Sequence, residues 1–233
     1  IFFQKYSQMS RSQQGLAGAG EWEKLRKLLP DFKDKRVLDL GCGYGWHCIY
    51  AMEHGASSVV GVDISHKMLE VAKEKTHFPQ VEYKCCAIED VEFPEESFDV
   101  ILSSLAFHYV ADYEILVKKI YRILKSGGKL VFTVEHPVFT AYGTQDWYYN
   151  EKGEILHFPV DNYYYEGKRT AVFLGEKVTK FHRTLTTYLN TLLSNGFIIN
   201  HIVEPQPPEN MMDIPGMQDE MRRPMMLIVS ANK

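Results

Sequence analysis

The chain has 233 residues, of which 45% are hydrophobic and 24% charged, and its formal net charge is −4. This length suits one large domain better than two independent ones, and the composition is ordinary for a globular protein. The negative net charge argues against an extended nucleic-acid-binding surface, although it does not exclude an RNA substrate that is bound locally. No apolar run approaches the roughly 20 residues of a membrane span.

The amino-terminal sequence has neither the charged start nor the apolar core of a signal peptide, so we expect a cytoplasmic protein. The four cysteines, Cys42, Cys48, Cys85 and Cys86, form no Cys-x-x-Cys pair and have no zinc-like spacing with histidines. We therefore expect free thiols and no metal site.

Helices and strands are predicted in a regular order up to residue 135. A short helix and a Gly-rich loop are expected within residues 1–20, followed by an amphipathic helix over 21–29 that stops at Pro30. Apolar runs predict strands over 37–40, 57–63, 81–86, 98–104 and 130–134. Helices are expected after Trp46, after Ser65 and over 113–124, the last ending in a turn at 125–128. Strands alternating with helices predict a mostly parallel sheet with helices on both faces.

The regular alternation of strands and helices stops after residue 136. Residues 137–178 contain ten of the thirty aromatic residues and no clear long helix. A helix is expected over 178–194, and strands over 197–203 and 225–229 are expected to pair as an antiparallel hairpin at the sheet edge. The segment between these strands carries five of the ten prolines and four of the nine methionines, which predicts a long ordered loop. The predicted fold is α/β and Rossmann-like, a doubly wound sheet of seven strands with an aromatic-rich cap insertion.

The strand at 37–40 ends in glycines at alternate positions, Gly41, Gly43 and Gly45. Such a turn lets the backbone pass close to a ligand, and the following helix start offers unpaired N–H groups. Trp46 occupies the slot where the dinucleotide fingerprint has its last glycine, which argues against NAD or FAD. Asp39, two residues before the first glycine, is expected to face the ligand, where a carboxylate suits an amino group.

Asp63 lies at the end of the second strand, twenty residues after Gly43. In a strand–helix–strand unit this position faces a ribose, and a carboxylate here can accept hydrogen bonds from the ribose hydroxyls. The alternative is that Asp63 only begins the next helix, because acidic residues are favoured there. We favour the ribose role because the glycine turn precedes it.

Several of these motifs resemble class I S-adenosylmethionine-dependent methyltransferases, and most closely the small-molecule group that includes the quinone-biosynthesis enzymes. The matching segments lie between about residues 36 and 135, in the order 39–45, 61–65, 87–94, 97–101 and 124–130. The resemblance implies S-adenosyl-L-methionine as the cofactor and S-adenosyl-L-homocysteine as the product. One position departs from the family pattern, because Ala87 stands where an Asp usually meets the adenine amino group. Glu89 or a backbone carbonyl must then substitute, or the contact is absent.

The resemblance also implies roles for individual residues. The glycine turn would hold the methionine part of the cofactor, Ile64 would pack on the adenine, and Arg11 of an amino-terminal lid would pair with the methionine carboxylate. A solvated Arg11 on a mobile arm is the alternative. The implied cofactor site consists of Arg11, Asp39, Gly41, Cys42, Gly43, Asp63, Ile64, Met68, Ile88, Glu89, Ser103 and Ser104.

Three residues that follow strands are candidates for a general base: His108, Glu135 and His136. Ligands of doubly wound sheets bind at the carboxyl ends of strands, and histidine is the commonest base near neutral pH. A structural role for His108 is an equal alternative. The run 182–184 is expected at an exposed helix start.

The sequence therefore predicts a methyltransferase that moves a methyl group to an O, N or C nucleophile of a small molecule by in-line displacement. The partner is expected to be this acceptor, with no nucleic acid or membrane, and the protein is expected to be a monomer or homodimer. A non-catalytic sensor or scaffold that binds the cofactor, and an NAD-dependent oxidoreductase, are the alternatives. The expected single domain divides into a lid and helix (1–35), a cofactor-binding core (36–136), a substrate cap (137–178) and a carboxyl-terminal helix and hairpin (179–233). The cap aromatics would form an apolar acceptor pocket, or would only pack the insertion onto the sheet.

Overall fold

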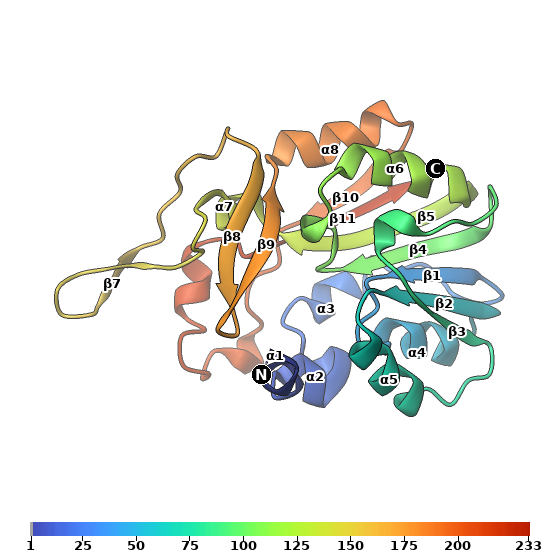
Figure 1. The fold of residues 1–233 in the computed structure, drawn as a ribbon, viewed down its shortest axis with the longest axis horizontal. Helices are drawn as coiled ribbons and strands as arrows, with labels where there is room; N and C mark the ends of the chain where they lie inside the picture. The colour runs from blue at the N-terminus through green and yellow to red at the C-terminus, as the bar shows by residue number, and fades with distance from the viewer. Residues whose placement is uncertain (1) are drawn as a thin grey trace.

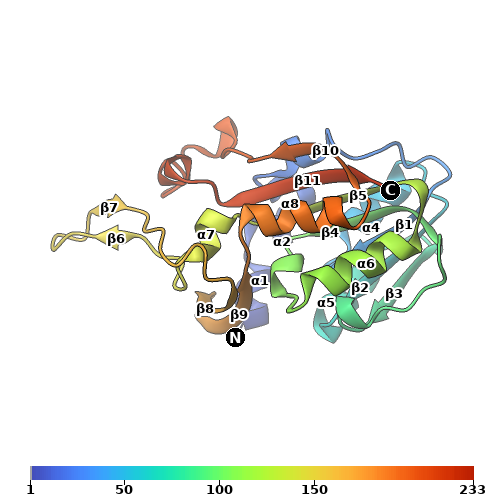
Figure 2. The same ribbon diagram turned by 90° about the horizontal axis from the view of Figure 1, so that it is seen from above.

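The fold is described from a computed structural model, which defines residues 2–233. A seven-stranded sheet forms the centre of the molecule, with helices above and below it (Figure 1). The amino-terminal helices, a two-stranded hairpin and the loop that precedes the last strand all gather at the end of the sheet where most strands terminate. Seen from above, a narrow two-stranded finger projects beyond this end (Figure 2).

The sheet has the strand order β10-β11-β5-β4-β1-β2-β3, and its strands are parallel except for β11, which runs antiparallel to both neighbours. This confirms the predicted doubly wound sheet with an antiparallel edge. The strands are β1 Arg36–Leu40, β2 Ser58–Asp63, β3 Val81–Cys85, β4 Phe98–Ser104, β5 Leu124–Glu135, β10 Ile198–Val203 and β11 Met226–Asn232.

Helices cover the two faces of the sheet and form two separate cores. One face packs against α6 (Tyr113–Ile123) and α8 (Leu185–Ser194), and the other against α3 (Trp22–Leu25), α4 (Trp46–Glu53) and α5 (His66–Lys75). Successive side chains of a strand point to opposite faces. In β1, Val37 therefore joins the core under α4, and Leu38 and Leu40 join the other.

The amino-terminal segment forms α1 (Phe2–Ser7), α2 (Ser10–Gln14) and the 3-10 turn η1 (Gly15–Gly18) before α3. The helix predicted over 21–29 is shorter than expected, since α3 ends at Leu25 and the chain continues in turns toward Pro30.

Two expectations for the second half were wrong. The helix expected from residue 178 begins only at Leu185, because residues 176–182 form strand β9 (Glu176–His182). β9 pairs along its whole length with β8 (Gly167–Phe173), and these ladder hydrogen bonds outweigh the local helical pattern. The turn expected at 125–128 is a bulge within β5, where the register jumps from Phe98↔Leu124 to Val100↔Lys129.

The remaining elements are short. The finger consists of β6 (Tyr148–Tyr149) and β7 (Ile155–His157), and it follows helix α7 (Pro137–Ala141). Single 3-10 turns are η2 (Ile88–Asp90), η3 (Phe107–Tyr109), η4 (Glu209–Met211) and η5 (Asp219–Arg222). Among residues 2–233, no helix has both the length and the apolar character that crossing a bilayer requires.

Candidate active site

A cavity of about 560 Å³ lies at the carboxyl ends of the parallel strands. One side is formed by the glycine turn and Asp63, and the opposite side by His108, Tyr109 and Glu135. The roof comes from the amino-terminal helices and the β8–β9 hairpin, which contributes Phe173 and Val178. Its volume falls within the range of small-molecule sites.

The glycine turn is shaped by close packing on one side and by open space on the other. A Cβ at Gly41 would lie 2.4 Å from the Cβ of Ala106, so this position must be glycine. At Gly43 a Cβ would meet only the Tyr6 hydroxyl, 3.9 Å away, and would project into the cavity. Both glycines have positive φ angles, 80° and 53°, which other residues rarely adopt. The backbone at Gly43 is therefore exposed for close approach of a ligand.

Asp63 holds the glycine turn against the end of β2. Its Oδ2 accepts the Gly43 N–H over 2.9 Å, and its Oδ1 accepts the Ser65 N–H over 2.8 Å. Burial raises the pKa of Asp63, and the two N–H groups limit the rise. Each carboxylate oxygen retains a lone pair, and the side chain lines the cavity. Asp63 thus holds the glycine turn in place and can still accept further hydrogen bonds from a ligand.

Next to Asp63 the cavity has an apolar wall. Ile64 is 72% exposed and lines the cavity together with Met68, Ile88 and Glu89. Ser65, between Ile64 and α5, is the N-cap of α5, so Asp63 is not itself the helix cap. Ile64 and Asp63 thus place exposed apolar surface beside a carboxylate at this side of the cavity.

Three residues of the expected cofactor site do not line the cavity. Asp39 is 1% exposed and faces α4, on the same side of β1 as Val37, where its Oδ2 accepts the Cys48 thiol over 3.4 Å. Burial raises the pKa of Asp39 to about 7. Ser103 donates its Oγ–H to the Leu40 carbonyl over 2.8 Å, and Cys42 is buried in the α4 core. These residues support the turn from behind. Ser104, by contrast, lines the cavity as expected.

A small recess of about 50 Å³ opens beside the cavity, between α2, α3 and the start of α4. Four buried polar atoms that line it have no hydrogen-bond partner among the described residues: Ser12 Oγ, Glu21 Oε2, Trp46 Nε1 and His47 Nε2. Buried polar groups are rarely left unpaired, so this recess is built for water or for a polar ligand group.

Arg11 lines both the recess and the cavity. It donates to Glu21 Oε1 over 2.5 Å, and the Glu21 side chain is only 2% exposed. Arg11 is therefore held by an internal ion pair and does not lie on a solvated arm, and its contact with the cofactor stays a prediction. Burial lowers the pKa of His47 to about 4, so the neighbouring ring is neutral.

On the opposite side, Glu135 belongs to a buried polar cluster. Its Oε1 accepts from Lys180 Nζ over 2.6 Å and its Oε2 accepts from Gln145 Nε2 over 2.7 Å. Lys180 also donates to Gln145 Oε1 over 2.8 Å. Burial alone would raise the pKa of Glu135, but His108, Lys180 and these hydrogen bonds bring it below its ordinary value. Glu135 is therefore ionised at the cavity surface.

Neither Lys180 nor Gln145 was expected at the site. Lys180 lies on β9, in the stretch that sequence periodicity placed in a helix, and Gln145 lies in the irregular segment before the finger. The β-branched residues Val178 and Thr179 favour a strand around Lys180, and they were its weak local signal. For Gln145 we find none.

His108 contributes a hydrogen-bond donor. Its Nδ1 accepts the Glu135 backbone N–H over 3.3 Å, so the neutral ring carries its proton on Nε2. Burial lowers its pKa to about 4, which keeps it neutral at ordinary pH. The accepting nitrogen is thus occupied, and His108 is a poor general base.

His136 does not line the cavity. Its Nδ1 accepts the Val138 N–H over 3.1 Å as the N-cap of α7, and its Nε2 lies 2.9 Å from Glu204 Oε1. Burial lowers its pKa although Glu204 opposes the shift. His136 therefore begins a helix and ties it to the loop after β10.

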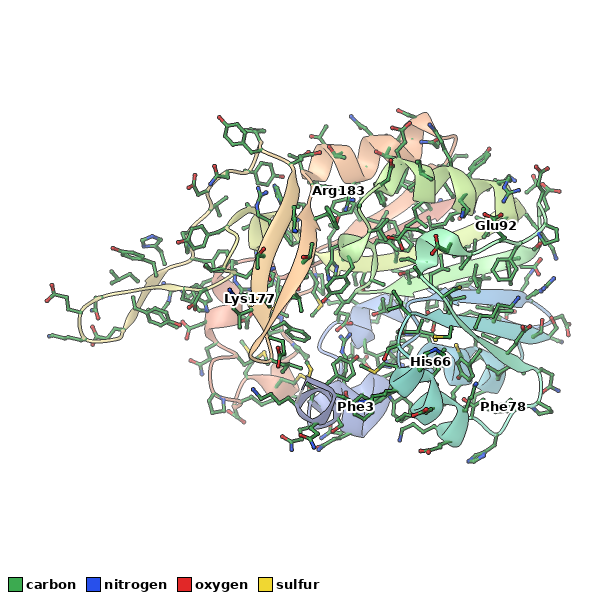
Figure 3. All side chains as sticks on the ribbon, viewed as in Figure 1. Phe3, His66, Phe78, Glu92, Lys177 and Arg183 are labelled. Atoms are coloured by element: carbon green, nitrogen blue, oxygen red, sulfur yellow. The ribbon has the colours of Figure 1, made fainter. Side chains whose placement is uncertain are left out.

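The run 182–184 is buried, which corrects the expected exposed helix start. Arg183 lies where β9 meets α6 and α8 (Figure 3), and its guanidinium donates to the carbonyls of Val110 and Ala111. Thr184 is the N-cap of α8. These contacts fix the hairpin, and with it Lys180, over the cavity. No group of three His, Cys, Asp or Glu side chains within residues 2–233 is placed to hold a metal ion.

Comparisons with known proteins agree with this fold. Residues 38–132 match the family described as "Methyltransferase domain". A crystal structure of a protein assigned as an S-adenosylmethionine-dependent methyltransferase, from Listeria monocytogenes, is 58% identical, with a TM-score of 0.90 over 94% of this chain and 99% of that one. The S-adenosylmethionine-dependent methyltransferase from Mesorhizobium loti is 40% identical, with a TM-score of 0.87 over 94% and 100% of the two chains.

A more distant relative matches only in part. The ubiquinone biosynthesis O-methyltransferase from Coxiella burnetii is 36% identical over 112 residues, which are 47% of each chain. The two full-length matches establish the family, and the chain belongs to the class I S-adenosylmethionine-dependent methyltransferases.

Proposed function

We propose that the protein transfers a methyl group from S-adenosylmethionine to an O, N or C nucleophile of a small molecule. One observation carries the proposal: a single cavity has the glycine turn and Asp63 on one side and the polar cluster around Glu135 on the other. A cofactor bound at the first side and an acceptor at the second would meet within one cavity, which the amino-terminal helices and the hairpin partly cover.

The residues present fit the cofactor along its length. Asp63 would accept from the ribose hydroxyls, Ile64 and Ile88 would contact the base, and Gly43 would lie against the chain that leads to the sulfur. The amino-acid end would extend toward the recess, whose paired Arg11 and Glu21 have no net charge together. The amino-acid end is a zwitterion: its carboxylate can accept from an unpaired donor such as Trp46 Nε1–H, and its ammonium group can donate to an unpaired acceptor such as Glu21 Oε2. When bound, the cofactor supplies an activated methyl group.

The chain's own residues would then position the acceptor. The Glu135 carboxylate can accept a hydrogen bond from an acceptor O–H or N–H, and His108 Nε2–H is the donor of the same region. Methyl transfer requires the nucleophile at about 3–3.5 Å from the carbon and in line with the bond that breaks. The pKa values of both Glu135 and His108 are lowered, which makes both side chains weak bases. We therefore infer that the site acts mainly by orienting the acceptor and not by general-base catalysis.

A small-molecule acceptor is supported by the volume of the cavity, which falls within the range of small-molecule sites. The name of the Coxiella burnetii relative favours an oxygen nucleophile, but that match spans under half of each chain. The acceptor atom therefore stays among O, N and C in this proposal.

Calorimetry with S-adenosylmethionine, S-adenosylhomocysteine and NADH tests the cofactor, and transfer of a labelled methyl group to a panel of phenols, amines and carbon acids tests the reaction. We expect binding of the first two ligands and labelling of at least one acceptor class. Binding of NADH alone would refute the proposal. Tight cofactor binding without transfer to any acceptor would support a sensor instead.

A further inference from the structure

A second cavity, of about 640 Å³, adjoins the first. We call it the Met/Pro chamber, because its walls include Met211, Met217 and three prolines of the loop before β11, at 205, 207 and 208. The finger contributes Trp147 and Ile155, and the amino-terminal helices close it from the other side. This loop, the finger and the lid helices meet at the same end of the molecule (Figure 1).

The two cavities border each other. Four residues line both, namely Met9, Arg11, Met225 and Met226. Met226 begins β11 and lies opposite Glu135 in the antiparallel ladder. The boundary between the cavities therefore lies beside the polar cluster, at the side of the first cavity where the acceptor would bind.

The chamber has no unpaired charge among the described residues. Its four charged lining side chains are each in an ion pair: Arg11 with Glu21, Asp219 with Arg222 at 3.0 Å and Glu220 with Arg223 at 2.7 Å. A charged ligand would have to compete with these partners. Methionine side chains, in contrast, adapt to apolar groups of irregular shape.

We propose that the Met/Pro chamber binds an extended, uncharged hydrocarbon part of the methyl acceptor while its nucleophilic head group lies at Glu135. This inference rests on the proposed function and specifies its substrate class: an amphiphilic molecule with a polar head and an aliphatic or aromatic extension. The first cavity is needed for the cofactor and the reacting atoms. A large apolar chamber that opens beside Glu135 then selects acceptors by their apolar part.

The proposal is tested with uncharged probes that need no knowledge of the natural acceptor. N-phenyl-1-naphthylamine reports apolar binding by fluorescence, and 4-alkylphenols from ethyl to octyl displace it. Each additional buried CH₂ group is expected to improve displacement about fourfold until the chamber is filled. Saturating S-adenosylhomocysteine should leave probe binding intact.

Two variants place a charge in the chamber wall without touching the cofactor residues, Ile214→Asp and Met211→Asp. Ile214 is 49% exposed, so folding should tolerate the change. We expect both variants to lose probe affinity at least tenfold and to lose the dependence on alkyl length, with S-adenosylhomocysteine affinity within twofold of the unmodified protein. Leu193→Asp is the matched control, because Leu193 is 53% exposed on α8, remote from the chamber, and should change nothing.

Other outcomes overturn the inference. Equal binding of all alkylphenols, unchanged probe affinity in both variants, or displacement of the probe by S-adenosylhomocysteine would each exclude an acceptor chamber. A dimer that Ile214→Asp converts to a monomer would assign this surface to a second copy instead. If the unmodified protein does not bind S-adenosylhomocysteine, the proposed function itself is refuted. If it binds S-adenosylhomocysteine but shows one of the outcomes above, only the chamber is refuted.

Discussion

Gly43 and Asp63 are joined by a hydrogen bond of 2.9 Å from the backbone N–H of the first to Oδ2 of the second. The bond ties the glycine turn after β1 to the end of β2, and it leaves the open face of the turn toward the cavity. Asp63 therefore acts on the site twice, through the shape of the turn and through its own accepting oxygens.

The first prediction concerns this bond. Asp63→Ala removes the acceptor for two backbone N–H groups and the expected partner of the ribose, so S-adenosylhomocysteine affinity should fall at least tenfold, about 1.4 kcal/mol. Calorimetry measures the change. Asp31→Ala is a control, since Asp31 is exposed and remote from the cavity. Unchanged affinity would refute the ribose role and leave Asp63 only the structural role of accepting the Gly43 and Ser65 N–H groups.

The second prediction concerns the recess beside α2. Ser12→Ala removes a buried hydroxyl that has no partner among residues 2–233, so folding should not suffer. If the amino-acid end of the cofactor enters the recess, affinity for S-adenosylhomocysteine should fall about fivefold, because loss of one neutral hydrogen bond corresponds to about 1 kcal/mol.

Methylthioadenosine is the matched ligand, because it lacks the amino-acid end and should bind Ser12→Ala as it binds the unmodified protein. Ser7→Ala, in the same segment but outside the recess, is the control variant. Equal effects on both ligands would mean that the recess holds only water.

The third prediction concerns the buried pair of Lys180 and Glu135. Lys180→Met leaves a buried carboxylate without its cation and should lower the free energy of unfolding by about 3–5 kcal/mol. The double variant Lys180→Met/Glu135→Gln should be more stable than the single one, because the unpaired charge is gone. Urea unfolding gives both values.

The exposed pair of Lys118 and Glu114 is the control for this experiment, at 2.7 Å but with both side chains about 60% exposed. Lys118→Met should change stability by less than about 1 kcal/mol. If Lys180→Met behaves like Lys118→Met, the buried cluster does not stabilise Glu135.

The fourth prediction concerns pH. Burial raises the pKa of Asp39 to about 7 in the folded protein, so between pH 4 and 7 the folded state binds more protons here than the unfolded state. Stability should therefore fall as pH rises through this window. Asp39→Asn removes this slope, and its advantage over the unmodified protein should grow to at most about 4 kcal/mol above pH 7.

Urea unfolding at pH 5 and pH 8 measures this difference. Asp34→Asn, at an exposed turn before β1, should show no such trend. An Asp39→Asn variant with the same advantage at both pH values would contradict the raised pKa.

Local sequence patterns were sufficient for the cofactor side of the cavity. Gly41 and Gly43 end an apolar strand, and Asp63 ends the next one, so the strand–turn–helix–strand order alone brings them together. The same patterns misplaced Asp39, because strand alternation puts it on the face of Val37, under α4, although it lies two residues from the turn.

The acceptor side depends on contacts between distant segments. Lys180 and Gln145 reach Glu135 across 45 and 10 residues of sequence, and the β8–β9 ladder that carries Lys180 had no local signature strong enough to exclude a helix. The recess of four unpaired polar atoms likewise needs α2, α3 and α4 to meet.

The sequence by itself thus determined the doubly wound sheet and its glycine cradle, because hydrophobic periodicity and turn chemistry act over a few neighbouring residues. Only the tertiary structure decided the side that we propose for the acceptor, namely the ionised Glu135, the neutral donor His108 and the Met/Pro chamber. Burial and long-range pairing set the charge state and direction of those side chains, and both depend on what the folded chain places around them.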